Sequence, residues 1–574
     1  MPPTSLIHGP SQPALWHKTL STVIDEQEAR YGDRTAAIIP WQSVRLTYRD
    51  LAARSRIVAN AVLGMGLTRG DHVGIMAGNC YEYLEVFLGC GRIGCPVIVL
   101  NNTYTPMELQ NAAQRSSCKL VFISLKIGRN NLAKHVETLR GNQPTNTTIP
   151  ELRRIVVLDL NASAPAGGVE TQHYAAFVSS NELIVENTSS LNAVEELVSP
   201  QDVLNLQFTS GTTGSPKAAM LSHVNIINNA RFVGHAMRLT PSDVVCCPPP
   251  LFHCFGLVMG FLASFCYGSA IVFPSDAFDA DRVVEAMIRE SATVIIGVPT
   301  MYLAELDAIS RMKSRPRNLR TGLASGSSVS QALMDRLRAE MGVDKMLIAY
   351  GMTETSPVTF ITSLEDGDDK GTSTVGKPLP HTAAKVVSPE GKTLGRGKRG
   401  ELCTSGFGLQ KGYWRNEEKT REVMRPDMDG NLWMHTGDEA VIDKDGYAKI
   451  TGRIKDIIIR GGENIFPREI EELLMAHPSI VEASVVGVKD EKYGEVVGCF
   501  LKRAERASKL EDQAVRSHVL DHLGRHKAPQ HIFWIGDAGV GTDFPKTGSG
   551  KHQKHILRDI GNRLVRQGEA WAKL

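Results

Sequence analysis

Short apolar runs alternate with amphipathic segments through the first half of the chain. Runs at 72–76, 96–100 and 120–124 neighbour stretches with helical spacing of apolar positions, such as 48–63 and 81–91. The same alternation predicts strands at 203–209, 244–248, 270–273 and 293–298, and helices at 107–115, 224–238 and 282–290. Uninterrupted apolar strands are typical of parallel sheets covered on both faces. We therefore predict an α/β fold with parallel-type sheets.

The pattern changes in the last third of the chain. Residues 380–450 read as short strands separated by turns, which indicates a small β-rich subdomain. After Arg453 a new succession begins, with strands expected at 480–502 (a pair) and 531–535 and helices at 467–476 and 512–523. We predict a large N-terminal domain, 1–454, followed by a mobile α+β C-terminal domain, 455–574.

Composition restricts the classes of function. The formal net charge of +2 gives no electrostatic reason to expect a nucleic-acid partner. Ten cysteines are scattered without a CxxC pair, so we expect buried free thiols. The uncharged stretch 255–274 has the length of a membrane span, but Gly268 and Ser269 interrupt it. A buried helix that leads into a strand fits better, and we expect no membrane span.

A loop rich in glycine and hydroxyl groups follows the apolar strand at 203–209. It reads Thr-Ser-Gly-Thr-Thr-Gly-Ser-Pro-Lys from Thr209 to Lys217. Glycines permit a tight turn whose N–H groups can face phosphate oxygens, and Lys217 adds a positive charge. The spacing is not that of the Walker loop, and taken alone a polar surface loop is an alternative.

Two further motifs carry carboxylates next to turns. Tyr-Gly-Met-Thr-Glu-Thr at 350–355 follows an apolar run, and it places Glu354 where α/β folds bind ligands. Glu354 could ligate magnesium, and Thr353 could hydrogen-bond a phosphate oxygen. Trp-Met-His-Thr-Gly-Asp at 433–438 ends on Asp438, whose two oxygens suit the paired hydroxyls of a ribose. Each motif alone could equally be a structural turn.

The last two motifs lie in or beside the C-terminal domain. Gly-Arg-Ile-Lys-Asp at 452–456 leads to Arg-Gly-Gly-Glu-Asn-Ile at 460–465, where a double glycine permits close approach of another molecule. Pro-Lys-Thr-Gly-Ser-Gly-Lys at 545–551 could be a flexible loop that inserts Lys551 into a site and withdraws it. A salt-bridged hairpin and a mobile polar tail are the structural alternatives.

In this order and at these separations, the five motifs resemble the adenylate-forming superfamily of acyl-CoA synthetases, coumarate–CoA ligases, luciferases and peptide-synthetase adenylation domains. The segments Leu-Gln-Phe-Thr-Ser-Gly at 206–211 and Gly-Leu-Ala-Ser-Gly-Ser at 322–327 are most similar to medium-chain fatty acyl-CoA ligases. The resemblance implies an ATP-dependent ligase that forms an acyl-adenylate and then an acyl-CoA thioester. The implied cofactors and co-substrates are ATP, Mg²⁺ and coenzyme A.

The resemblance also implies roles for individual residues. The residues around the nucleotide phosphates would be Thr209, Ser210, Gly211, Thr212, Thr213, Gly214, Ser215, Pro216 and Lys217. Those beside adenine and the α-phosphate would be Gly326, Ser327, Ala349, Tyr350, Gly351, Met352 and Thr353. Those beside coenzyme A would be Gly461, Gly462, Glu463 and Asn464. Glu354 would hold magnesium, Asp438 would bind the ribose hydroxyls, and Arg453 would bind the nucleotide. Lys455 would be the hinge, Lys551 would catalyse adenylation, and His253 would border the acyl carboxylate.

Departures from the family pattern are Ala218, Ser328 and His552, and none of them removes a charged or liganding group. Two other functions are consistent with the motifs: an adenylating enzyme that loads a carrier-protein thiol, and a catalytically silent nucleotide-binding interaction protein. No carrier domain follows Leu574, which disfavours the first. The joint presence of Lys551, Glu354 and Asp438 disfavours the second.

The acid and the compartment are less determined by sequence. Expected pocket walls at 253–257, 298–303 and 326–329 suit a medium-chain or branched aliphatic acid, hydroxylated or not, and an aromatic acid stays open. The chain ends in Ala-Lys-Leu at 572–574, which resembles a Ser-Lys-Leu peroxisomal address. We expect recognition by a peroxisomal import receptor, with the cytoplasm as the alternative location.

Overall fold

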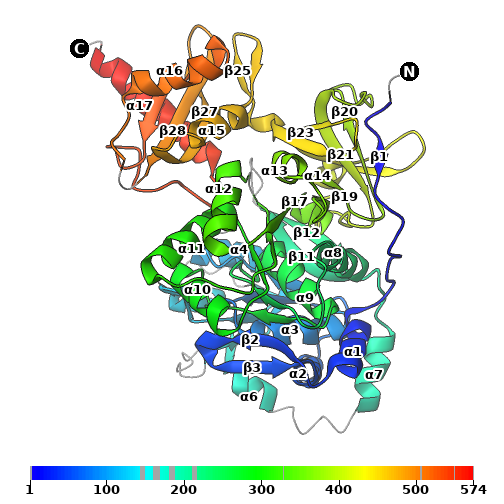
Figure 1. The fold of residues 1–574 in the computed structure, drawn as a ribbon. Coiled ribbons are helices and arrows are strands. Elements are labelled where there is room, and N and C mark those ends of the chain that lie inside the picture. Colours follow the sequence, from blue (N-terminus) through cyan, green and yellow to red (C-terminus); the bar gives the residue numbers. More distant parts are fainter. Residues whose placement is uncertain are drawn as a thin grey trace.

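A computed structural model describes residues 3–141, 149–159, 169–179, 188–209, 216–326, 329–504, 507–547 and 550–572. Two large sheets with their helices make up the lower body in Figure 1, and a β-rich subdomain lies above them. A separate α+β unit, coloured orange to red, contains the C-terminal residues. The predicted α/β fold class, with a large N-terminal part and a smaller C-terminal part, is confirmed.

The first large sheet has seven strands, in the order β10-β9-β6-β4-β5-β11-β12. All its pairs are parallel except β11 with β12, which form an antiparallel hairpin. The strands are β4 (His72–Met76), β5 (Val97–Val99), β6 (Cys118–Ile123), β9 (Arg154–Val157), β10 (Glu170–His173), β11 (Val203–Thr209) and β12 (Lys217–Ser222). The strand predicted at 203–209 is β11, and its antiparallel partner β12, which follows the phosphate-loop motif, was not predicted.

The second large sheet has nine strands, in the order β19-β18-β17-β16-β15-β13-β14-β2-β3. It is parallel from β17 to β2 and antiparallel at both ends. The strands are β2 (Thr35–Ile39), β3 (Val44–Thr47), β13 (Val244–Cys246), β14 (Ala270–Val272), β15 (Val294–Gly297), β16 (Thr321–Ala324), β17 (Lys345–Gly351), β18 (Val358–Ile361) and β19 (Lys377–Pro378). Neighbouring parallel strands bring their carboxyl ends to one edge, where ligands bind in such folds.

Helices connect and cover these strands. They are α1 (Leu20–Tyr31), α2 (Tyr48–Gly64), α3 (Tyr81–Arg92), α4 (Pro106–Arg115), α5 (Ala133–Arg140), α6 (Tyr174–Ser179), α7 (Thr188–Glu196), α8 (His223–Ala236), α9 (Ala263–Cys266), α10 (Ala280–Arg289), α11 (Pro299–Met312), α12 (Gln331–Arg336) and α13 (Asp368–Ser373). Helix α2 begins with a capping box, in which Thr47 and Asp50 satisfy each other's backbone N–H groups. Such caps explain why the predicted helix starts agree closely with the observed ones.

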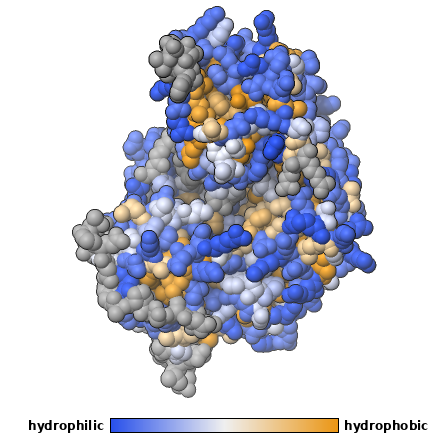
Figure 2. Space-filling view, turned by 90° about the vertical axis from the view of Figure 1, so that its left-hand side faces the viewer, coloured by the Kyte–Doolittle hydropathy of each residue, from blue (hydrophilic) through white to orange (hydrophobic). Residues whose placement is uncertain are grey.

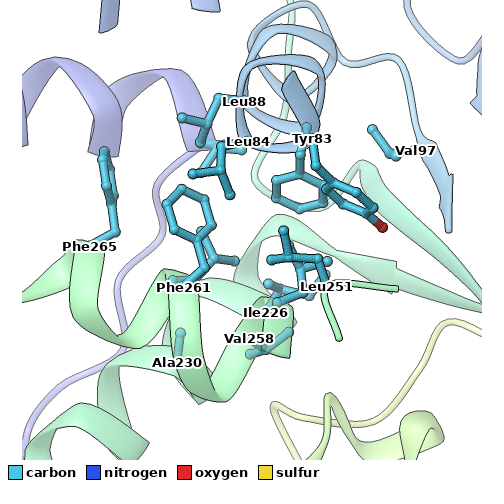
Figure 3. Close-up of a cluster of buried hydrophobic side chains, with 14 of the residues drawn as sticks. Tyr83, Leu84, Leu88, Val97, Ile226, Ala230, Leu251, Val258, Phe261 and Phe265 are labelled. Atoms are coloured by element: carbon cyan, nitrogen blue, oxygen red, sulfur yellow. The ribbon is translucent and has the colours of Figure 1, made fainter. Parts of the chain in front are cut away.

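The largest hydrophobic core joins the two sheets. In Figure 3, side chains of α3 face those of α8 and of a π-helix, Phe255–Leu262. The labelled residues are Tyr83, Leu84, Leu88, Val97, Ile226, Ala230, Leu251, Val258, Phe261 and Phe265. All ten cysteines are free and buried, as expected. The uncharged stretch 255–274 is thus an interior helix followed by β14, as predicted.

The β-rich subdomain is an antiparallel sheet in the order β1-β20-β21-β23-β22, and β24 also pairs with β23. Its elements are β1 (Ile7–His8), β20 (Thr382–Val387), β21 (Arg399–Gly406), α14 (Glu417–Val423), β22 (Met424–Pro426), β23 (Leu432–Ile442) and β24 (Ala448–Arg453). The N-terminal strand β1 was not predicted to belong here, since two residues carry no readable period.

The C-terminal unit begins after a 3₁₀ turn, Ile454–Asp456. Its sheet has the order β26-β25-β28-β27, and β29 pairs in parallel with β28. The elements are β25 (Ile458–Arg460), β26 (Glu463–Ile465), α15 (Pro467–Met475), β27 (Ile480–Asp490), β28 (Gly494–Arg503), α16 (Asp512–His522), β29 (His531–Trp534) and α17 (Lys554–Ala572). Helix α17 was not predicted, and it continues to the first residue of the expected peroxisomal address.

The surface seen in Figure 2 is mainly hydrophilic, with small hydrophobic areas on both the lower body and the upper C-terminal unit. Among the helices of the described ranges, none has the length and apolarity needed to cross a lipid bilayer.

Candidate active site

The phosphate-loop motif joins the two strands of the β11–β12 hairpin. Thr209 and Lys217 are paired across it, and the Thr209 hydroxyl lies 3.5 Å from the Lys217 carbonyl oxygen. Residues 210–215 are outside the described part of the chain. The Lys217 ammonium lies 5.1 Å from the centroid of the Tyr413 ring. The Lys217 side chain is therefore directed toward Tyr413.

Tyr413 also contacts the predicted magnesium ligand. Its hydroxyl donates a hydrogen bond of 2.8 Å to Oε1 of Glu354. Glu354 is only 6% exposed and belongs to a 3₁₀ turn, Thr353–Thr355, just beyond β17. Burial and the neighbouring carboxylate raise the pKa of the Tyr413 phenol. The tyrosine thus stays protonated and holds the carboxylate in one orientation.

The turn before Glu354 requires glycine. A Cβ on Gly351 would lie 1.8 Å from the Pro357 carbonyl oxygen. Met352 continues the turn, where its N–H donates to the Pro357 carbonyl oxygen. The close approach of these two backbone segments places Thr353 and Glu354 in a turn directly after the end of β17.

The predicted ribose ligand lies in a network of three side chains. The Tyr350 hydroxyl donates to Oδ2 of Asp438 at 2.7 Å, and Nε of Arg453 lies 3.2 Å from Oδ1. Asp438 and Arg453 are direct partners across β23 and β24. Asp438 is buried, and burial together with its charge raises the pKa of the Tyr350 phenol. The two paired oxygens of Asp438 are therefore fixed at the edge of the site.

A second glycine position supports the expected adenine wall. Gly326 follows β16 with φ +91°, where a Cβ would lie 3.1 Å from the Val298 side chain. The preceding Ser325 hydroxyl donates to the carbonyl oxygen of Ala349, at 2.9 Å, on the neighbouring strand β17. These residues end adjacent parallel strands, so they share one edge. Ser327 lies outside the described residues.

His253 is placed by its neighbours. Its Nδ1 accepts a hydrogen bond from the Phe255 N–H at 3.1 Å. The Gln207 amide donates to the Phe252 carbonyl oxygen and accepts from the Cys254 thiol, so it holds the residues on either side of His253. Burial first, and then the charge of Lys551, lower the pKa of the His253 imidazole to about 4. The ring is neutral at physiological pH.

Lys551 reaches this site from the C-terminal unit. Burial and the charge of Arg453 lower the pKa of its ammonium, while Asp438 and Glu354 act in the opposite direction. A Cβ on the adjacent Gly550 would lie 3.6 Å from the Thr300 hydroxyl of α11. Residues separated by almost 200 positions in the chain are thus within electrostatic range of one another.

The predicted coenzyme A segment has a different environment. Gly461 and Gly462 form the turn of the β25–β26 hairpin with φ +57° and +88°. The Gly461 N–H donates to the Tyr493 carbonyl oxygen, and Glu463 lies 3.8 Å from His526, both within the C-terminal unit. Asn464 pairs across the same hairpin. Lys455 is exposed in the 3₁₀ turn between the two units.

Three supporting residues were missed from the sequence: Gln207, Tyr413 and Glu401. Glu401 accepts from the His435 ring at 2.7 Å and from the Gly437 N–H at 3.1 Å, which fixes the turn before Asp438. Glu401, Cys403 and His435 form a compact group whose polar atoms lie within 4.8 Å of one another, and the Cys403 thiol lies 3.5 Å from Nδ1 of His435. Gln207 lies within the family-like segment 206–211, which was the available signal. Tyr413 lies in a loop and Glu401 within strand β21, and neither position carries a sequence pattern that marks it.

The folded chain thus gathers Lys217, Glu354, Asp438 and Lys551, which come from motifs far apart in the sequence, around one candidate site. The chain belongs to the AMP-binding enzyme family. The family model matches residues 24–414, and the model of the AMP-binding enzyme C-terminal domain matches 469–551. The predicted class of enzyme, an acid–thiol ligase of the AMP-forming acyl-CoA synthetase type that uses ATP and coenzyme A, is confirmed.

Several relatives are similar over nearly their whole length. Acyl-CoA ligase SID4 of Ajellomyces capsulatus is 46% identical, covering 98% of this chain and 94% of the relative. The mitochondrial medium-chain acyl-CoA ligase ACSF2 of Danio rerio is 35% identical, with 97% and 90% covered. Among solved structures, ATP-bound MatB from Rhodopseudomonas palustris has a TM-score of 0.77 at 26% identity, covering 95% and 100%. An anthranilate CoA ligase, AuaEII, has a TM-score of 0.82 at 23% identity, covering 96% and 98%.

Proposed function

We propose that the protein activates an aliphatic carboxylic acid of medium chain length, straight or branched, in two half-reactions on one site. The observation that carries the assignment of residues is the position of Lys551. Its ammonium lies within electrostatic range of Arg453, Asp438 and Glu354, and it acts on His253. This is the arrangement expected for the first half-reaction, in which the acid and ATP meet.

In that half-reaction an oxygen of the substrate carboxylate attacks the α-phosphorus of ATP. The bond to the β-phosphate oxygen breaks, and pyrophosphate leaves with the electron pair. Negative charge builds up on the phosphate oxygens, where Lys551 and Lys217 donate hydrogen bonds and positive charge. Because the His253 imidazole is neutral, it can contact the acid without forming an ion pair that would over-stabilise the substrate carboxylate. Asp438 accepts hydrogen bonds from the ribose hydroxyls.

The residues present fit a magnesium ion at Glu354. Its carboxylate offers hard oxygen ligands, is buried, and is oriented by Tyr413, as a metal-ligating carboxylate usually is. Magnesium bound there supplies charge neutralisation to the phosphates of ATP. Thr353 stands beside it on the same turn and can donate to a phosphate oxygen.

The second half-reaction needs a thiol in the place of Lys551. The sulfur of coenzyme A attacks the acyl carbonyl carbon, and AMP leaves. Because one site cannot hold both groups, the C-terminal domain turns about Lys455, withdraws Lys551 and presents the β25–β26 hairpin with Gly461 and Asn464. The exposure of Lys455 in a short turn between the two units supports a pivot at this position.

The acid binds beside His253 and the start of α11. Buried Val298 and half-buried Thr300 lie near the Lys551 loop, since a Cβ on Gly550 would be 3.6–3.8 Å from both. Buried Phe255 lies two residues beyond His253. These mainly apolar groups support an aliphatic chain, and a relative at 35% identity is named a medium-chain acyl-CoA ligase.

A panel of acids tests this assignment. Release of AMP in the presence of ATP and coenzyme A should be greatest with straight or branched aliphatic acids of medium chain length. A panel maximum with benzoate-type acids would overturn the aliphatic assignment, and hydroxylated acids of the same length show whether a hydroxyl is accepted. Acid-dependent exchange of pyrophosphate into ATP without any turnover of coenzyme A would favour a carrier-protein thiol as acceptor. Absence of exchange with every acid would favour a silent nucleotide-binding protein.

We also propose that Ala572-Lys573-Leu574 directs the enzyme to peroxisomes, because it resembles a Ser-Lys-Leu address. The last two residues lie outside the described part of the chain. The test is import of the protein with a free C-terminus, compared with a version whose terminus is masked by a fused tag. Equal import of both versions would contradict this location.

A further inference from the structure

The loop that carries Lys551 is a hairpin with a defined base. Lys546 and His552 face each other across it in an antiparallel bridge. The Thr547 N–H donates to the Lys551 carbonyl oxygen at 2.8 Å, and the Thr547 hydroxyl accepts from the Lys551 N–H at 3.1 Å. The position of the Lys551 side chain therefore depends on how the two arms of this hairpin are held.

A single carboxylate on β27 binds both arms. Oε2 of Glu482 lies 2.7 Å from the Lys546 ammonium and 3.0 Å from Nε2 of His552, the residue directly after Lys551. The other oxygen, Oε1, lies 3.7 Å from the ammonium of Lys502. Glu482 is thus the point at which the hairpin is held to β27, the strand at one end of the C-terminal sheet.

The surroundings make this contact specific. The His552 ring stacks on buried Phe544, with centroids 4.3 Å apart and planes 13° apart, so Nε2 is aimed at Glu482. Burial by itself raises the pKa of Glu482, but the hydrogen bonds from His552 and Lys546 outweigh it and lower the pKa to about 2. The carboxylate is therefore charged throughout the working pH range. Charge-assisted hydrogen bonds of this kind are short and directional.

We propose that Glu482 is a positioning residue for adenylation: it clamps both arms of the 546–552 hairpin and so aims Lys551 at the nucleotide. The inference rests on the proposed role of Lys551. It goes further in assigning the aim of that lysine to a residue that touches neither ATP nor the acid. A misplacement of about 1 Å at a catalytic group can lower a rate by about a hundredfold.

The alternative is that Glu482 only stabilises the C-terminal domain. The two half-reactions separate these roles, because thioester formation from preformed acyl-adenylate does not use Lys551. Glu482→Gln removes the charge but keeps the size of the side chain. We expect it to lower the kcat of acid-dependent ATP–pyrophosphate exchange by about 10- to 100-fold, with KM for ATP within about threefold. Thioester formation from the adenylate should change by less than about twofold.

A matched control is available in the same domain. Glu469 forms an ion pair of 2.6 Å with Lys527, away from the hairpin. Glu469→Gln removes an ion pair without touching the Lys551 loop, so both half-reactions should keep their rates. Equal loss of both half-reactions in Glu482→Gln, or an unchanged exchange rate, would overturn the clamp.

A double-substitution cycle distinguishes failure of the clamp from failure of the proposed function. In a Lys551→Ala background the aim of the loop has no consequence, so adding Glu482→Gln should not lower exchange further. If Lys551→Ala itself leaves exchange unchanged, the proposed role of the lysine is wrong. If Lys551→Ala abolishes exchange while Glu482→Gln leaves it intact, only the clamp is wrong.

Discussion

The hydrogen bond between Tyr413 and Glu354 offers a sharp test of the proposed metal and phosphate end of the site. Tyr413→Phe keeps the aromatic ring that lies 5.1 Å from the Lys217 ammonium, and removes only the hydroxyl that binds Glu354 at 2.8 Å. The carboxylate is 6% exposed, so water can replace the lost donor only in part. The substitution therefore changes the orientation of one carboxylate and little else.

The expected size follows from that geometry. A hydrogen bond to a charged group contributes about 1.5–3 kcal/mol. Loss of a group that orients a metal ligand costs about 10- to 100-fold in affinity or activity, which is roughly 1.4–2.7 kcal/mol. We therefore expect Tyr413→Phe to lower acid-dependent ATP–pyrophosphate exchange by about 10- to 100-fold, and to shift the magnesium concentration for half-maximal exchange upward.

The assay is exchange measured over a magnesium series, with Tyr447→Phe as the matched control. The Tyr447 hydroxyl donates to Oδ1 of Asp366 at 2.6 Å, outside the candidate site, so its loss should leave exchange within about twofold. Exchange by Tyr413→Phe within twofold of the unaltered protein at every magnesium concentration would refute the reasoning. So would an equal effect of the two substitutions.

Three further predictions concern the backbone, a buried acid and the hinge. Gly351→Ala should lower the free energy of unfolding by more than the roughly 1–3 kcal/mol of ordinary overpacking, because its Cβ would lie 1.8 Å from a carbonyl oxygen. Gly367 has open space around it, so Gly367→Ala should change the free energy of unfolding by less than about 0.5 kcal/mol in the same denaturant titrations. Burial raises the pKa of Glu305 to about 8, and neither carboxylate oxygen has a partner among the described residues. Since the unfolded carboxyl ionises near 4.5, the protonated form contributes stability below that pH, and this contribution, ~5 kcal/mol, is lost as the pH rises toward 8. Glu305→Gln should therefore flatten the decline of Tm between pH 5 and 8, and an unchanged slope would contradict the assigned pKa. Lys455→Pro restricts φ at the proposed pivot, so thioester formation should slow by about tenfold or more while exchange stays within about twofold; equal rates in both half-reactions would argue against the hinge.

The periodic parts of the fold were predictable because burial on both faces leaves a plain apolar signal. The strand at 72–76 and the helix at 48–63 agree with β4 and α2 almost to the residue. Strand β1 was missed because its two residues are placed by pairing with β20, which is distant in sequence. Helix α17 was missed because its polar composition resembles that of a mobile tail.

The residues of the candidate site also divide into those that local sequence indicated and those that it did not. Residues within compact motifs, such as Glu354 and Asp438, could be named from local sequence because glycine turns and charged groups stand together. Tyr413 and Glu482 could not, since each acts through a contact about 60 to 70 positions away in the chain. A lone tyrosine or glutamate in a loop or strand has no pattern that distinguishes it from a surface residue. Such supporting partners become visible only when the chain is folded.

The central claim is that Lys551 of the C-terminal domain completes a nucleotide site built by the N-terminal domain. The most direct measurement compares both half-reactions in Lys551→Met, which keeps an unbranched side chain one atom shorter and removes its charge. Loss of one such electrostatic contact costs about 3–4 kcal/mol, so acid-dependent ATP–pyrophosphate exchange should fall by at least a few hundredfold, while thioester formation from preformed acyl-adenylate persists. Equal loss in both half-reactions, or exchange at the rate of the unaltered protein, would contradict the account.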